Sequence, residues 1–163
     1  MSEKALENPS VRRVRQALVE AGVGDKVVAV SDTTRSAAEA AAALCVEQGA
    51  IVKSLVFSIG GDPVMALVAG DRQCDTKALR DVLGLSGKVK RPDADAVRAA
   101  TGFAIGGVSP VAHTTDLPVV IDASLGRFEA VYAAAGHPHC IFPTTLDELK
   151  TLTGGTVSET ISQ

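Results

Sequence analysis

Residues 50–70 read AIVKSLVFSIGGDPVMALVAG. Over 50–59 the side chains alternate between two faces, which is the period of a β-strand. Residues 60–63, GGDP, are typical turn residues, and the apolar run VMALVAG follows them. Two such runs joined by a short glycine-containing turn predict an antiparallel β-hairpin.

One position in the first strand of this hairpin breaks the apolar pattern. The odd-numbered face carries Lys53 among three large apolar side chains. The even-numbered face carries two valines and two serines, at positions 52, 54, 56 and 58. We expect the odd-numbered face to be the buried one, yet an unpaired ammonium group is costly to bury. The sequence therefore predicts that Lys53 either reaches the protein surface or lines a cleft.

Before the hairpin, the sequence predicts a helix, a strand and a second helix. Apolar residues recur at helical spacing after Ser10, and the run 27–30 is short and β-branched. Ser36 and Glu39 form a capping box for a helix that we expect to end at Gly49. The arginines at positions 12, 13 and 15 are predicted to form a solvent-exposed face of the first helix.

After the hairpin, capping residues at 75, 93 and 145 predict three more helices, and strands are expected at 117–123, 128–135 and 140–142. The basic cluster 88–91 is predicted to be solvated surface, with contact to a phosphate as the alternative. Residues 1–163 are expected to form a single mixed α/β domain with substantial antiparallel pairing and short flexible ends at about 1–8 and 156–163.

Composition narrows the class of protein. A chain of 163 residues that is 46% hydrophobic and 21% charged can build one core, which excludes disordered and disulfide-scaffold proteins. Aromatic residues make up 3%, and the net charge is −3. Base stacking on a row of rings and wholesale capture of a phosphate backbone by charge are therefore both disfavoured, which leaves local basic patches open. Three cysteines without CxxC spacing and a charged N-terminus predict a cytoplasmic protein that is neither secreted nor membrane-embedded.

The segment 102–110, GFAIGGVSP, is the most unusual local feature of the chain. Adjacent glycines allow successive backbone N–H groups to point at one oxygen, so the loop could stabilise an oxyanion or bind a phosphate. A tight turn between a helix and a strand explains the same residues. Spacing alone leaves both interpretations open.

Other catalytic arrangements have weak support in the sequence. His137 and His139 share a strand face and suit zinc, but Cys140 lies on the opposite face and Pro138 interrupts the strand. No G-x-S-x-G motif indicates a serine triad. We therefore predict no metal and no cofactor.

Four segments together resemble the YbaK/ProX-like aminoacyl-tRNA editing domains: GAIVKSLVFSIGGDPVMALVAGDRQCD, TGFAIGGVSPVAH, LPVVIDASLGRFEAVYAAAGHPHCIF and LDELKTLTGG. These proteins are free-standing relatives of the editing insertion of bacterial prolyl-tRNA synthetases. The two specific motifs are the strand lysine, here Lys53, and the G-x-x-x-P loop, here Gly106–Pro110. The resemblance implies a largely antiparallel curved sheet flanked by helices, with Lys53 and the loop facing each other across the substrate cleft.

The resemblance also implies a function and a set of site residues. The expected activity is trans-editing hydrolysis of a small amino acid mischarged on tRNA, with proline tRNA as the expected carrier, and the expected partners are the acceptor end of aminoacyl-tRNA and prolyl-tRNA synthetase. The substrate's own ribose hydroxyl would help to activate water. The implied catalytic residues are Lys53, Gly106 and Gly107, and the implied substrate-binding residues are Val108, Ser109, Pro110, His113, Asp122, Ala134 and Gly136.

Two of these assignments carry alternatives. Asp122 either orients the site or caps the following turn. Ala134 and Gly136 fall where the YbaK subgroup has Ser-Ala-Gly, so the amino-acid pocket lacks a hydroxyl and alanine, serine, cysteine or aminobutyrate remain possible substrates. Two other functions remain open: a non-catalytic module that binds tRNA or a synthetase, and a metal-assisted hydrolase that uses His137 and His139.

Overall fold

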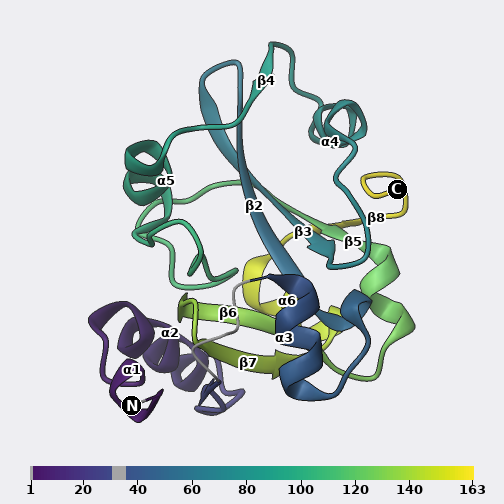
Figure 1. Ribbon diagram of the computed structural model, residues 1–163. Helices are drawn as coiled ribbons and strands as arrows, with labels where there is room; N and C mark the ends of the chain where they lie inside the picture. Colours follow the sequence, from purple (N-terminus) through teal and green to yellow (C-terminus); the bar gives the residue numbers. More distant parts are fainter. Residues whose placement is uncertain (1, 31–35) are drawn as a thin grey trace.

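A computed structural model describes residues 2–30 and 36–163 (Figure 1). Two sheets lie side by side, a five-stranded sheet of order β4-β2-β3-β5-β8 and a three-stranded sheet of order β1-β7-β6. The elements are α1 (Ser2–Ala5), α2 (Pro9–Glu20), β1 (Val28–Ala29), α3 (Ala37–Leu44), η1 (Gln48–Ala50), β2 (Val52–Ile59), β3 (Asp62–Ala69), α4 (Thr76–Leu83), β4 (Val89–Lys90), α5 (Ala94–Thr101), β5 (Val119–Asp122), η2 (Ala123–Arg127), β6 (Val131–His137), β7 (Cys140–Thr144), α6 (Leu146–Thr153) and β8 (Thr156–Ser158). The mixed α/β class is confirmed.

The predicted hairpin is the centre of the larger sheet. β2 and β3 pair antiparallel along their whole length, from Val52 opposite Ala69 to Ile59 opposite Asp62. Gly60 and Gly61 form the turn with φ of 60° and 92°, values that glycine adopts without steric cost. β5 and β8 then add in parallel, which makes the sheet mixed.

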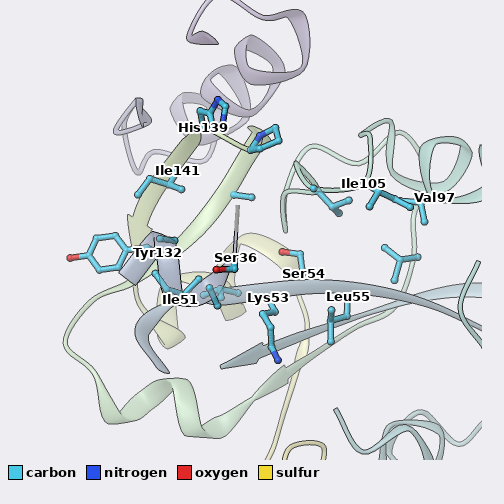
Figure 2. Close-up of a pocket in the computed structure, with 18 of the residues that line it drawn as sticks. Ser36, Ile51, Lys53, Ser54, Leu55, Val97, Ile105, Tyr132, His139 and Ile141 are labelled. Carbon is cyan, nitrogen blue, oxygen red and sulfur yellow. The ribbon is translucent and has the colours of Figure 1, made fainter. Parts of the chain in front are cut away.

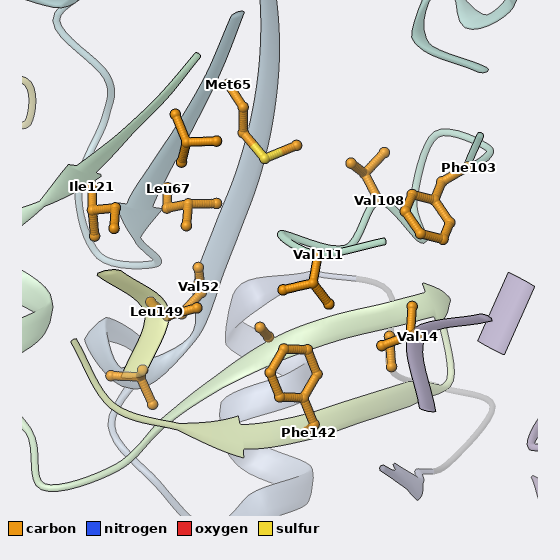
Figure 3. Packing of buried hydrophobic residues seen from close by; sticks show 14 of the residues in the cluster. Val14, Val52, Met65, Leu67, Phe103, Val108, Val111, Ile121, Phe142 and Leu149 are labelled. Carbon is orange, nitrogen blue, oxygen red and sulfur yellow. The ribbon is translucent and has the colours of Figure 1, made fainter. Parts of the chain in front are cut away.

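Both faces of the larger sheet are buried, not one as the alternation suggested. Val52 and Val56 on the even-numbered face join a core that continues into the smaller sheet and reaches Phe142 (Figure 3). Phe57 and Ile59 on the odd-numbered face pack in a second core with α4 and the C-terminal segment. A strand covered on both sides gives a weak periodic signal, because each face needs apolar residues.

Two helix boundaries differ from the sequence prediction. Asn8, not Ser10, caps α2: its Oδ1 accepts a hydrogen bond from the Ser10 N–H at 2.9 Å. α3 ends at Leu44, before the expected stop at Gly49, because Cys45 adopts the left-handed conformation with φ of 57°. The alanine run gave no local signal for that early end.

The C-terminal segment is part of the fold. β8 pairs in parallel with β5, and Ile161 is completely buried in the second core. Residues 156–163, which we expected to be a flexible end, thus help to cover the odd-numbered face of β2. Within residues 2–30 and 36–163, no helix is long and apolar enough to cross a membrane.

Asp122 has a structural role. Its carboxylate is buried and accepts hydrogen bonds from the Ala69 N–H at 3.0 Å, the Ser124 N–H at 2.9 Å and the Ser124 hydroxyl at 2.7 Å. These bonds cap η2 and tie it to the end of β3. Of the two interpretations of Asp122, the geometry supports capping.

Replacing Asp122 tests this role. Asp122→Ala leaves the buried Ala69 N–H without an acceptor and should lower the free energy of unfolding by about 2–4 kcal/mol. Asp122→Asn keeps one acceptor oxygen and should cost less. Urea denaturation of both variants measures the effect, and a loss in Asp122→Ala of less than about 0.5 kcal/mol would contradict it.

Candidate functional site

A pocket of about 700 Å³ opens along one edge of β2, between the two sheets (Figure 2). β3 covers the other edge of this strand completely, while β4 pairs, within the described residues, with Ser58 and Ile59 alone. At the opposite end a bridge between Ile51 and Tyr132 joins the strand to β6. The stretch of β2 between these two contacts is left as an open edge, and the pocket lies against it.

The open edge presents backbone groups as well as side chains. The Gly60 N–H donates to the Lys88 carbonyl just before β4, and the Ile51 carbonyl accepts from Gly70 just beyond β3. Because peptide groups alternate along a strand, the N–H and C=O groups of Ser54 and Val56 face the same side as those of Gly60. The pocket is therefore bordered by main-chain donors and acceptors.

Ser54 adds a side chain to this border. Its Oγ is buried and, among the described residues, has no hydrogen-bond partner. A buried hydroxyl without a partner costs about 1–3 kcal/mol, so such groups in native proteins call for an explanation. Ser54 is also one of the residues that line the pocket.

Lys53 also lines the pocket, but its amine leaves the strand on the other face. Nζ donates to the Arg72 carbonyl, just beyond the end of β3. In Figure 2 the amine points away from Ser54 and His139. In this conformation the ammonium does not face the glycine loop as expected, since residues 53 and 54 project to opposite sides of the sheet.

The glycine loop, residues 102–111, contributes Ile105, Gly106 and Val108 to the lining of the pocket. The two adjacent glycines have different roles. Gly107 donates its N–H to the Ala104 carbonyl at 3.1 Å, and a Cβ there would lie 2.8 Å from the His137 nitrogen. In the described part of the chain the N–H groups of Gly106 and Val108 have no acceptor. The loop amides without an acceptor thus flank Gly107 and do not include it.

The other predicted site residues divide into two groups. Ala134 lines the pocket. Gly136 lies in a bulge of β6, where a Cβ would come within 2.8 Å of the Ser10 carbonyl of α2. Ser109 and Pro110 are buried residues of the loop itself, and His113 Nε2 donates to the Ser109 carbonyl at 2.7 Å. Unlike Ala134, the residues of this second group form or support the loop and do not line the pocket.

Several pocket residues were missed by the sequence analysis. Arg91 comes from the basic cluster 88–91, and its guanidinium carbon lies 5.1 Å from the centroid of the Phe57 ring. Ile105 is 61% exposed at the rim, although it stands in an apolar stretch. Tyr132 comes from β6. His139, which the sequence suggested only as a metal ligand, lies in the turn between β6 and β7. Strand and loop residues of this kind carry no local signal of a pocket that two sheets form together.

Metal and thiol chemistry have little support here. Within residues 2–30 and 36–163 no group of three or more histidine, cysteine or acidic side chains could hold an ion, although the His137 and His139 rings lie 5.1 Å apart. Burial raises the pKa of the Cys74 and Cys140 thiols to about 11. Both thiols are therefore protonated near neutral pH and are poor nucleophiles.

His113 makes the stability of the loop region dependent on pH. Burial lowers its pKa, the hydrogen bond to Ser109 opposes this, and the Arg13 charge adds to the lowering. The unfolded chain, with an ordinary histidine pKa of about 6.5, therefore binds a proton before the folded chain does. Stability attributable to His113 is present above about pH 6.5 and is lost as the pH falls below it.

We therefore expect His113→Gln to flatten the acid side of the stability profile. Between pH 7.5 and 5.5, the free energy of unfolding of the wild type should fall relative to that of the variant, by at most about 1.4 kcal/mol per pH unit. Urea denaturation at several pH values measures the difference, in which titrations common to both proteins cancel. Parallel profiles would show that His113 is not the group responsible.

Comparison with known proteins places this geometry in a family. The model of the aminoacyl-tRNA editing domain matches residues 31–152. The uncharacterized protein YwhH of Bacillus subtilis (strain 168) is 32% identical over 141 residues, covering 86% of this chain and 88% of that protein. A proline–tRNA ligase of Desulfovibrio desulfuricans is 39% identical over 106 residues, which are 64% of this chain and 18% of the ligase.

The fold comparison agrees. A crystal structure described as "a putative trans-editing enzyme for prolyl tRNA synthetase" superposes with a TM-score of 0.86 at 42% identity, covering 93% of this chain and 96% of that one. The chain belongs to the aminoacyl-tRNA editing domain family.

Proposed function

We propose that this protein hydrolyses the ester bond between a small, wrongly attached amino acid and a tRNA, with proline tRNA as the carrier. The observation that carries the proposal is the pocket at the open edge of β2. It brings together the Ser54 hydroxyl and a loop with two amides, all three without a hydrogen-bond partner among residues 2–30 and 36–163. Membership of the editing family and the likeness to a segment of proline–tRNA ligases support this substrate class.

The reaction needs few protein groups. Water adds to the ester carbonyl carbon, the bond from that carbon to the ribose oxygen breaks, and the ribose oxygen leaves with the electron pair and takes up a proton. Negative charge develops on the carbonyl oxygen, where the N–H groups of Gly106 and Val108 would donate hydrogen bonds. The neighbouring ribose hydroxyl would help to activate the water. An aminoacyl ester is already reactive, so positioning and aligned donors are sufficient.

Ser54 would hold the substrate from the strand side of the pocket. Its hydroxyl can donate to an ester or ribose oxygen and can accept from the substrate's amino group. The adjacent main-chain groups of β2 offer further hydrogen bonds along the same edge. Substrate bound here would give the Ser54 hydroxyl the hydrogen-bond partner that it lacks among the residues the structure describes.

Two cations would bind the nucleotide end. Arg91 lines the pocket and can pair with the phosphate of the terminal nucleotide. Lys53 would join it by exchanging the Arg72 carbonyl for the phosphate, which the flexible lysine side chain permits. The amino-acid end would meet Ala134 and Ile141, an apolar wall that distinguishes substrates by size at about 1–3 kcal/mol per methylene.

A deacylation panel tests the function. Purified protein is mixed with proline tRNA carrying alanine, serine, cysteine or 2-aminobutyrate, and with correctly charged prolyl-tRNA as the control. We expect at least one small amino acid to be released about tenfold or more above the spontaneous rate, while prolyl-tRNA is spared. Lys53→Ala should raise KM more than it lowers kcat, since its proposed contact is with the nucleotide.

Three results would contradict this proposal. Release of no amino acid together with retention of tRNA would indicate a binding module. Loss of activity in a chelator would indicate the metal-assisted alternative. If Lys53→Ala kept wild-type kinetics and lost only stability, the lysine would be limited to holding the turn at Arg72.

Ser54→Ala separates substrate binding from folding. Removal of an unpartnered buried hydroxyl should leave the free energy of unfolding unchanged or slightly raised, whereas kcat/KM should fall by about 10- to 100-fold. Ser58→Ala, on the same strand and face but outside the pocket lining, is the matched control. Full activity in Ser54→Ala would remove this residue from the site.

A further inference from the structure

The three arginines of α2 do not share one environment. We expected the arginines at 12, 13 and 15 to form a solvent-exposed face, and for Arg12 this is correct. Arg15 pairs with Asp25, with Nε 2.7 Å from Oδ2. Arg13 is partly buried and faces the segment that follows α5, so the prediction is wrong for this residue.

Arg13 holds both ends of the glycine loop. Its Nε donates to the Ala112 carbonyl at 3.0 Å and its Nη2 to the Thr101 carbonyl at 3.2 Å. The guanidinium carbon lies 4.5 Å from the centroid of the Phe103 ring. Within residues 2–30 and 36–163 it forms no salt bridge. One planar group thus fastens residues 102–111 at the point where the loop begins and where it ends.

The backbone around this contact is built to fit the guanidinium. Ala112 has a φ of 64°, a left-handed conformation that is disfavoured for a residue with a Cβ. Gly102 has a φ of 83°, and a Cβ there would lie 2.5 Å from Arg13 Nη2. The backbone is thus left-handed at both places that Arg13 approaches: at Ala112, and at Gly102, which follows Thr101 and ends α5.

We propose that Arg13 is a positioning residue, which holds the loop so that the Gly106 and Val108 amides stay in place at the pocket. This inference rests on the proposed function, because it assigns the amides a task in the reaction. Arg13 does not line the pocket, so its effect passes through the loop. Donors to a developing charge must keep their geometry to about 0.5 Å, and a displacement of about 1 Å can cost about 100-fold in rate.

The kinetic test compares Arg13→Ala, Arg13→Lys and the control Arg12→Ala, which removes an exposed arginine from the adjacent position. In Arg13→Ala, kcat should fall about 10- to 100-fold with KM within about threefold, because the amides act in the transition state. The kcat of Arg13→Lys should lie between those of the wild type and Arg13→Ala, since an ammonium lacks the planar fork that reaches two carbonyls. Millimolar methylguanidinium should restore part of the kcat of Arg13→Ala.

Amide hydrogen exchange provides a readout that does not depend on substrate. Exchange over residues 102–112 should be faster in Arg13→Ala than in the wild type and unchanged in Arg12→Ala. If Arg13→Ala fails to fold, Arg13→Lys takes its place and should also exchange faster. Unchanged exchange over this segment, or wild-type kcat in a folded Arg13 variant, would overturn the inference. If the wild type releases no amino acid, the proposed function fails, and the exchange measurement alone decides whether Arg13 holds the loop.

Discussion

The incomplete pairing of β2 leaves one edge of that strand open to the candidate pocket. Buried backbone N–H and C=O groups require partners, and a strand inside a fold normally finds them on both sides. β3 supplies partners along one edge, but within the described residues β4 reaches only the last two positions of the other, and β6 touches the strand at Ile51. The edge between these contacts is left to the pocket, where Ser54 adds a hydroxyl without a partner. The hydrogen-bonding capacity of the pocket is therefore built into the sheet.

The parts of the fold that depend on neighbours in sequence could be predicted. The hairpin follows from local alternation and a glycine turn, and the helices that begin after Asp75, Asp93 and Thr145 follow from caps whose side chains bond the backbone as expected. What covers each face of β2 could not be predicted in this way. Phe57 shares a core with Ile161, which is more than a hundred residues away in the sequence. The residue pattern of one strand cannot indicate that a C-terminal segment packs over it.

Identical residue types in the candidate site have different structural surroundings, which the sequence pattern could not distinguish. Gly106 lines the pocket, whereas Gly107 lacks a side chain because the His137 backbone passes close by. Lys53 was rightly singled out as the exception on its strand, yet its amine bonds the Arg72 carbonyl. The sequence did not indicate Ser54 as a site residue. A serine between valines becomes informative only when the structure shows that its hydroxyl has no hydrogen-bond partner among the described residues.

A site of this kind draws its precision from packing rather than from reactive side chains. Gly107 lies against the β6 bulge, and a Cβ at Gly136 within that bulge would meet the Ser10 carbonyl at the start of α2. The same helix carries Arg13, which bonds the carbonyls at both ends of the loop. Close backbone contact with β6 thus holds the loop at Gly107, and the Arg13 guanidinium holds its two ends. Backbone amides stabilise a developing charge only if their N–H groups point at it. The rigid support of the loop is therefore the property that would let a glycine turn bind such a charge.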